Sequence, residues 1–407
     1  MTRKGADTAT LVPYLPRLAI EWAGSDPSTT FRVVDGSLVF ADVSGFTALS
    51  ERLARNGRQG AEELTETVGR CFGDLLRVAY DAGGSLIKFG GDALLLLFDG
   101  EDHAARACVS ALGMRATMAE VGRVTTTVGN VRLRMSVGVH SGALDLFRVG
   151  RSHRELIVTG PASTAIVDME AAASANEIVV SPGTAALVDT AVIGAARGPG
   201  FLLRDRPPEA ITRDVHGHIT DDGAGVAESI PIALREQLLE GQVESEHRQV
   251  SVAFIHFDGV DGMLAARGAV AVAAALDQLV ADVQEAADTH GVTFLATDVD
   301  RDGGKIILVA GAPRALGDDE DRMLRCVRSI ADGRRMLPVR IGVNRGPVFV
   351  GEVGPSFRRT YTVMGDAVNL AARLMATATP GQVLATATVL DQASTDFQAS
   401  ALPPFMV

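Results

Sequence analysis

The feature that most constrains the fold is an internal repeat, because the second half of the chain follows the pattern of the first. Residues 38–45 (LVFADVSG) match residues 252–259 (VAFIHFDG), and residues 134–142 (RMSVGVHSG) match residues 339–346 (VRIGVNRG). Gly160 then matches Gly365. Self-similarity over the length of a domain is typical of a duplication, so we expect two copies of one fold.

The order of the predicted elements is the same in both copies. Each copy starts with a strand and a long helix (roughly residues 60–81 and 266–289), followed by two short apolar strands around a turn (83–98 and 291–310). A helix, a strand, a strand pair and a helix starting near residue 162 or 367 follow. This alternation predicts an α/β fold, in the form of an α+β sandwich with helices covering a sheet.

Length and composition suggest where the domains begin and end. With 407 residues, the chain is long enough for two domains, each with its own core. Residues 206–248 are rich in Pro, Gly, Asp and Glu, which predicts a linker. We therefore expect an N-terminal segment (1–34), a first domain (35–205), this linker and a second domain (249–407).

Charge and cysteine content exclude several classes of protein. Asp and Glu number 50 against 38 Lys and Arg, so the chain repels nucleic acid and anionic membranes. Cys71, Cys108 and Cys326 are too widely spaced for a zinc site or a disulfide framework, and we expect them to be reduced core residues. We find no signal-peptide pattern and no apolar run of the ~18 residues that span a bilayer, so we expect a cytoplasmic protein without a membrane partner.

Two carboxylates of the first copy are the strongest candidates for chemistry. Asp42 follows an apolar strand and precedes a glycine turn, and Asp92 follows Gly90 and Gly91 in a tight hairpin. Carboxylates on adjacent strand ends, beside glycines that let a polyphosphate approach the backbone, suit two divalent ions and a nucleotide. Either Asp alone is also explained as a turn former.

The second copy carries a different pair of polar residues. Asn369 and Arg373 lie four residues apart, and so on one face of a predicted helix. At the matching positions the first copy has Thr164 and Asp168, while His256 in the second copy replaces Asp42. Each copy therefore keeps the half of a site that the other has lost. Without a partner domain, Arg373 is explained equally well as part of a solvated helix face.

This combination of motifs, in this order, closely resembles the class III nucleotidyl cyclases, and in particular their tandem form, the bicarbonate-responsive soluble adenylyl cyclases. The resemblance covers about residues 35–185 and 250–390. It implies ferredoxin-like or palm-like domains that associate head to tail as an intramolecular pseudo-heterodimer, with one catalytic site at their interface. Such a chain would be a monomer, because it needs no second copy.

The resemblance also implies a role for each candidate residue. Asp42, Asp92 and the Val43 carbonyl would hold two Mg²⁺ or Mn²⁺ ions, and the metals would activate the ribose 3′-hydroxyl and hold the leaving pyrophosphate. Asn369 would orient the ribose, and Arg373 would neutralise the pentavalent α-phosphate. The remaining residues implied to bind substrate are the phosphate ligands Gly45, Phe46, Thr47 and Arg134 and the base ligands Thr297 and Thr362. Thr362 favours adenine, whereas Thr297 stands where relatives carry a lysine, so we expect weakened ATP binding there.

The second, degenerate site is implied to be regulatory. In the bicarbonate-responsive relatives it binds the activator through a lysine and an arginine. Lys88 matches the lysine, but Val167 stands at the arginine position. An anion site without its guanidinium loses much of its attraction, which disfavours bicarbonate activation.

We therefore expect an adenylate cyclase that converts ATP to cyclic AMP and pyrophosphate. The alternative is a catalytically weak nucleotide-binding module that passes a signal to another domain. The chain ends in LPPFMV (402–407), and a similar stretch of long relatives leads into an NTPase and helical-repeat region. The resemblance implies such a region at the C-terminal side of the full-length protein.

Overall fold

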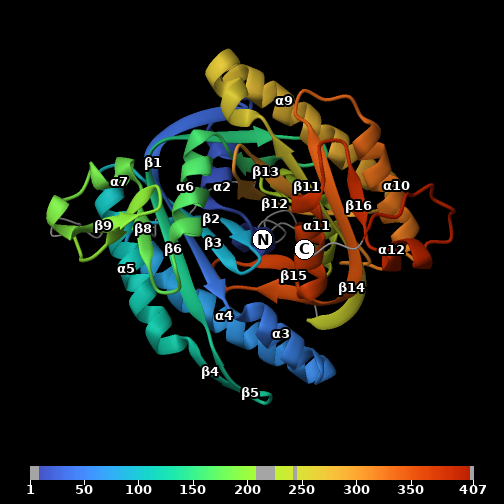
Figure 1. The fold of residues 1–407 in the computed structure, drawn as a ribbon, viewed down its shortest axis with the longest axis horizontal. Helices are drawn as coiled ribbons and strands as arrows, with labels where there is room; N and C mark the ends of the chain where they lie inside the picture. The colour runs from blue at the N-terminus through green and yellow to red at the C-terminus, as the bar shows by residue number, and fades with distance from the viewer. Residues whose placement is uncertain (1–8, 208–224, 242–244, 404–407) are drawn as a thin grey trace.

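The computed structural model describes residues 9–207, 225–241 and 245–403, which form two large β-sheets flanked by helices and a separate two-stranded sheet of β4 and β5 (Figure 1). The first sheet has eight strands in the order β2-β3-β1-β6-β8-β10-β9, with β7 paired to β6. The second has six strands in the order β12-β13-β11-β14-β15, with β16 paired to β14. Two α+β sandwiches of similar topology confirm the predicted fold class.

In the first half the elements follow the predicted order. Helix α4 (Gly57–Asp81) and the hairpin of β2 (Ser85–Gly90) and β3 (Ala93–Asp99) lie where the sequence placed them. The other elements are η1 (Val12–Tyr14), α2 (Arg17–Ser25), β1 (Phe31–Ser44), α3 (Phe46–Ala54), α5 (His103–Val121), β4 (Arg123–Thr126), β5 (Gly129–Arg132), β6 (Arg134–Val149), β7 (Glu155–Val158), α6 (Pro161–Ala172), β8 (Ile178–Val180), α7 (Pro182–Ala185), η2 (Thr190–Val192), β9 (Ile193–Arg197) and β10 (Gly200–Leu203).

The second half repeats this order after a connecting segment. Helix α11 (Asp366–Thr377) is the counterpart of α6, as the matching glycines predicted. The other elements are η3 (Ala227–Ser229), α8 (Ile232–Glu240), β11 (Glu246–Asp258), α9 (Val260–His290), β12 (Thr293–Asp300), β13 (Gly303–Ala310), α10 (Asp319–Asp332), β14 (Val339–Val353), β15 (Thr360–Met364), β16 (Val383–Ala385) and α12 (Ala387–Gln392).

Strand registers show that the two halves correspond residue by residue at the centre of each sheet. Asp42 of β1 pairs with Ser136 of β6, and His256 of β11 pairs with Arg340 of β14. Asp42 and His256 are therefore equivalent positions, as the sequence match required.

The halves pack head to tail, each contributing a strand end to the core of the other. Phe147 and Val149, near the end of β6, are buried in an apolar cluster with residues of α9, α10 and β11. Phe349 and Val353 of β14 are buried in the cluster formed by α3, α4, α5 and the first sheet. Burial of apolar strand ends in both directions stabilises the intramolecular pair.

Part of the segment expected to be a linker is packed structure. Leu234 and Leu238 of α8 are buried beside Leu11 and Leu15 of the N-terminal segment, in a cluster that covers the second sheet. These apolar contacts hold α8 against the rest of the protein although the surrounding sequence is rich in Pro and Gly. Residues 208–224 of the expected linker lie outside the described residues.

Helix α9 tests the expectation that the chain has no segment able to span a membrane. It is the one helix in the described part of the chain that is long and apolar enough to cross a membrane, with 33% of its most apolar window buried. Leu276 and Leu279 lie fully inside the core of the second half, but by length and composition this helix does not meet the expectation that no apolar segment is long enough to span a bilayer. The three cysteines are free and buried, as predicted.

Candidate active site between the two halves

The two candidate metal carboxylates are adjacent at one edge of the first sheet. Asp42 lies two residues before the end of β1 and pairs in register with Ala93. Asp92 lies in the turn between β2 and β3, where the Val43 N–H donates to its carbonyl oxygen at 3.1 Å. Gly91, with φ +70°, permits this turn. The structure therefore brings together Asp42, Val43 and Asp92.

These carboxylates lie in an environment that disfavours their charge. Burial raises the pKa of Asp42, and burial together with the charge of Asp42 raises the pKa of Asp92 to about 7. Asp298 and Glu170 also raise the pKa of Asp92. No Lys, Arg or His of the described chain forms an ion pair with either aspartate. A half-buried acid pair without such an ion pair fits divalent cations, which would supply the missing positive charge.

The protein alone supplies few metal ligands. Among the residues that the structure describes, no three or more His, Cys, Asp and Glu side chains are grouped to hold a metal ion. Two carboxylates and the Val43 carbonyl would therefore leave coordination positions open for water or for the oxygens of a bound phosphate.

The start of α3 lies directly after the strand that carries Asp42. Gly45 adopts φ +110° and is the N-cap of this helix, whose first N–H groups have no partner within the helix. The Phe46 side chain is fully buried with its ring centroid 5.3 Å from that of Phe72, so it can offer only its N–H group to a ligand. The side chain of Thr47 lies outside the described residues. Arg134 is exposed and pairs in register with Ser44, on the strand face that also carries Asp42.

Helix α11 presents Asn369 and Arg373 on an exposed face. Arg373 lies along its own helix, with Nη2 donating to Asp366 Oδ1 at 3.1 Å. Met364, the residue before the Gly365 N-cap, is buried in the same apolar cluster as Phe46. The starts of α3 and α11, which come from opposite halves, are therefore anchored in one core. Thr362 lies on β15 with only 9% of its surface exposed.

The degenerate site is closed by direct contacts between the halves. Thr164 Oγ1 of α6 donates to Asp261 Oδ2 of α9 at 2.7 Å and accepts from the Asp302 N–H at 2.8 Å. Asp168 forms an ion pair with Arg301 at 2.5 Å. Thr164 and Asp168 stand where α11 has Asn369 and Arg373, so the residues that replaced the polar pair now hold the halves together.

Asp302 also occupies the start of α9, the counterpart of α3. Its carboxylate accepts from the Gly259 N–H at 3.1 Å and the Asp261 N–H at 2.8 Å, and its carbonyl accepts from the Val260 N–H at 3.1 Å. Three successive N–H groups that could bind a phosphate are thereby used internally. With His256 at the position of Asp42 as well, the second site lacks both the matching aspartate and open N–H groups at the helix start.

The structure contradicts the alignment that put Thr297 at the lysine position. Lys88 pairs with Leu95, and Ala296 pairs with Ile307. Leu95 and Ile307 pair in turn with the equivalent residues Phe40 and Phe254. Ala296 is therefore the counterpart of Lys88. Each hairpin has a β-bulge at the equivalent place, so the bulges do not offset the two copies. The β12–β13 hairpin is two residue pairs longer than β2–β3, so the position cannot be counted back from the turn in the sequence.

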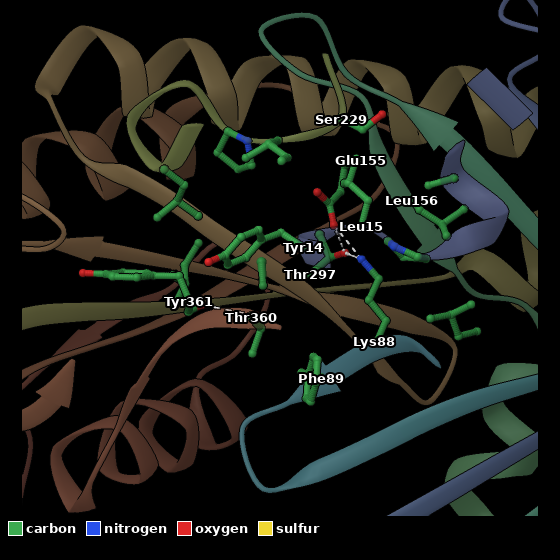
Figure 2. Close-up of a pocket in the computed structure, with 18 of the residues that line it drawn as sticks. Tyr14, Leu15, Lys88, Phe89, Glu155, Leu156, Ser229, Thr297, Thr360 and Tyr361 are labelled. Atoms are coloured by element: carbon green, nitrogen blue, oxygen red, sulfur yellow. Dashed lines mark hydrogen bonds and ion pairs between the residues drawn. The ribbon is translucent and has the colours of Figure 1, made fainter. Parts of the chain in front are cut away.

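Thr297 instead lies with Lys88, the residue assigned to the other site. Its Oγ1 accepts from Lys88 Nζ at 2.6 Å, and both contact Glu155 Oε1 at 2.6 Å (Figure 2). Val167, the other residue assigned to that site, packs against an apolar cluster that includes Ile166.

Sequence analysis missed two acidic residues at this interface. Glu155 follows no motif, and only the pairing of β7 with β6 brings it to Lys88. Asp298 of β12 approaches Gly90, where an added Cβ would lie 3.0 Å from its Oδ2. Neither contact joins residues that are near each other in sequence, so local patterns carried no signal for them.

The chain is similar to known proteins along both of its halves. The family model described as the adenylate and guanylate cyclase catalytic domain matches residues 32–202 and 243–406. Human adenylate cyclase type 10 is 25% identical over 412 residues, which cover 90% of this chain and 25% of that protein. An adenylate cyclase of Mycobacterium tuberculosis is 27% identical over 352 residues, covering 79% of this chain and 76% of that protein. The chain thus spans about a quarter of the length of the type 10 relatives.

A solved structure shares the fold across both halves. The crystal structure of a class III adenylyl cyclase-like ATP-binding protein from Pseudomonas aeruginosa has a TM-score of 0.60 and 13% identity, covering 96% of this chain and 92% of that chain. At that identity the likeness establishes the fold alone. Because the family model matches most of the chain in two successive segments, the protein belongs to the class III adenylyl and guanylyl cyclase family, with two tandem cyclase domains.

Proposed function

We propose that the chain converts ATP to 3′,5′-cyclic AMP and pyrophosphate at one site between its halves. The observation that carries this proposal is the half-buried Asp42–Asp92 pair, which forms no ion pair with a basic side chain of the described residues and lies beside the start of α3. Desolvation raises the pKa of both carboxyl groups, and the charge of Asp42 raises that of Asp92 further, so ionising the pair costs free energy that bound cations would offset.

In the proposed mechanism each half supplies a different function. Asp42, Asp92 and the Val43 carbonyl would hold two Mg²⁺ or Mn²⁺ ions, which when bound lower the pKa of the ribose 3′-hydroxyl and neutralise the pyrophosphate. The N–H groups at Gly45 and Phe46 would bind phosphate oxygens, supported by Arg134.

The second half would act on the sugar and on the reacting phosphate. Asn369 would hold the ribose so that its 3′-oxygen lies in line with the α-phosphorus. Arg373 would leave Asp366 and donate to the α-phosphate, where negative charge develops. Its present ion pair is half exposed, with 48% of the Arg373 side chain accessible, so little free energy opposes this movement.

Few side chains of the proposed site could select adenine. The Thr362 hydroxyl can donate or accept a hydrogen bond, and Ala296 at the counterpart of Lys88 supplies no charge. Two adenylate cyclases among the relatives support ATP as the substrate.

The test is cyclic nucleotide production from ATP and from GTP, with Mg²⁺ and with Mn²⁺. We expect cyclic AMP from the intact chain and none from Asp42→Ala. Arg373→Ala should lose on the order of a hundredfold or more in kcat while ATP binding is largely kept. Arg373→Lys is the matched control, since it keeps the charge but not the forked geometry, and should retain more activity than the alanine variant.

The second candidate function is a nucleotide-binding module with little or no turnover. The missing lysine at Ala296 favours it, and the structural neighbour from P. aeruginosa carries the description ATP-binding protein. ATP binding without product under any metal condition would support this candidate and refute the cyclase proposal.

A further inference from the structure

A buried polar bridge crosses the interface at some distance along the hairpin from the acid pair. It lines a cavity of about 110 Å³ between the halves, which the N-terminal segment and α8 also line (Figure 2). Lys88 lies on β2 and Glu155 on β7 of the first half, whereas Thr297 lies on β12 of the second.

The three side chains form a closed set of contacts. Lys88 Nζ donates to Glu155 Oε1 and to Thr297 Oγ1, and Thr297 Oγ1 donates to Glu155 Oε1, all at 2.6 Å. The other Glu155 oxygen, Oε2, lies 3.5 Å from His153 Nε2. Lys88 and Glu155 keep only 11% and 10% of their side chains exposed.

Glu155 holds its negative charge at this buried position. Burial by itself raises the pKa of Glu155, but the charge of Lys88 and the contact with His153 outweigh it and lower that pKa to about 2. The carboxylate is therefore the counter-ion of the Lys88 ammonium group at this buried position.

We propose that Glu155 acts as a built-in anion that joins the two halves and positions the hairpin carrying Asp92. Lys88 lies four residues before Asp92 in the same hairpin, and Thr297 ties the bridge to the other half. Because the anion is part of the chain, the pairing of the halves requires no small anion from solution. Glu155 touches no reacting atom in this scheme and is a positioning residue.

The neighbouring contacts agree with this role. Phe89, next to Lys88, packs on Phe72 of the first core, and the Arg358 guanidinium of the second half lies 5.3 Å above its ring. The β2–β3 hairpin thus contacts the second half through both Lys88 and Phe89. Loss of the Lys88 contacts should therefore shift the hairpin without unfolding it.

Chemical rescue tests the proposal. Glu155→Ala leaves Lys88 buried beside a space of carboxylate size, and its Tm should fall by roughly 10 °C. Sodium formate should restore much of that loss, whereas sodium chloride at equal ionic strength should not. In Lys88→Met/Glu155→Ala neither charge remains, so the Tm should be higher than in the single variant and insensitive to formate.

Glu155→Gln serves as the matched variant that keeps the shape. Its amide can still bond to Thr297 but cannot neutralise Lys88 and leaves no space for formate, so we expect a lower Tm without rescue. The effect on turnover rests on the proposed function: in Glu155→Ala, kcat should fall more than KM rises, and formate should restore kcat.

Two results would overturn the proposal. An unchanged Tm in both Glu155 variants would show that the bridge does not join the halves. Equal rescue by formate in the single and double variants would show a general salt effect. Because the Tm measurements need no catalysis, they stand even if the cyclase proposal fails.

Discussion

At the scale of single residues, the ionised carboxylates of the candidate site lower the stability of the metal-free fold. Asp42 and Asp92 share one sheet edge, and burial makes both harder to ionise. Groups with strongly perturbed pKa values are enriched at functional sites, because binding and catalysis often need such shifts. The acid pair therefore identifies the site more sharply than any hydrogen bond in it.

The raised pKa of Asp92 predicts that the stability of the metal-free protein depends on pH. The pKa of Asp92 is about 7 in the fold against an ordinary value of 3.8, so the folded state binds more protons between these values. Stability should therefore fall as pH rises from about 4 to about 7. In Asp92→Asn the metal-free Tm should exceed that of the unaltered protein by a few degrees at pH 8 and differ little at pH 5, as measured by thermal melts with a chelator. An Asn variant that is less stable at pH 8 would contradict the raised pKa.

At the scale of elements, the two central hairpins determine which site can work. The β12–β13 hairpin extends two residue pairs beyond the β2–β3 hairpin. The extension places Asp302 where it accepts from N–H groups at the start of α9, and it places Arg301 in its ion pair with Asp168. The shorter hairpin instead ends at Asp92, which leaves the start of α3 to a ligand. A difference in hairpin length thus separates a closed site from a candidate catalytic one.

The hairpin registers predict where a lysine would help. Ala296→Lys places an ammonium at the counterpart of Lys88 and should lower the KM for ATP without lowering the Tm much. Thr297→Lys, one residue along the strand, would place a second ammonium against buried Lys88 and should lower the Tm. Nucleotide titration and thermal melts of the two variants measure both effects. Better ATP binding in Thr297→Lys than in Ala296→Lys would show that the strand registers mislead.

At the scale of the whole molecule, the chain is an asymmetric pair built from one fold. The exchange of strand ends between the cores fixes the halves head to tail, and the degenerate site adds polar contacts that hold one side closed. We therefore expect substrate-driven movement, such as that proposed for Arg373, only at the candidate active site on the other side of the interface.

This asymmetry predicts one nucleotide per chain. Calorimetric titration with a non-hydrolysable ATP analogue and Mn²⁺ should give a stoichiometry of one, and Asp42→Ala should weaken binding at that site. Asp302→Ala frees N–H groups of α9 and should cost about 1 kcal/mol of stability, as the loss of a helix cap does. The stoichiometry should stay at one, because His256 and the Thr164–Asp261 contact remain. Two equivalent sites in the unaltered chain would refute the closed second site.

Much of this organisation could be predicted from the amino-acid sequence. The duplication, the fold class and the long helices followed from periodicity and self-similarity, which are local or translational patterns. The adjacency of Asp42 and Asp92 also followed, because each stands at a strand end beside glycines. The one-residue error at Thr297 was possible because the two hairpins differ in length, and strand pairing rather than local sequence sets their register.

By itself, then, the sequence determined that this protein has two cyclase domains, with the candidate metal carboxylates in one and the candidate residues Asn369 and Arg373 in the other. Only the tertiary structure decided that Asp302 fills the second site and that Glu155 neutralises Lys88 across from Thr297. The physical reason is that such contacts join residues distant along the chain, and their free energy depends on burial and on charges that approach each other only once the halves are packed.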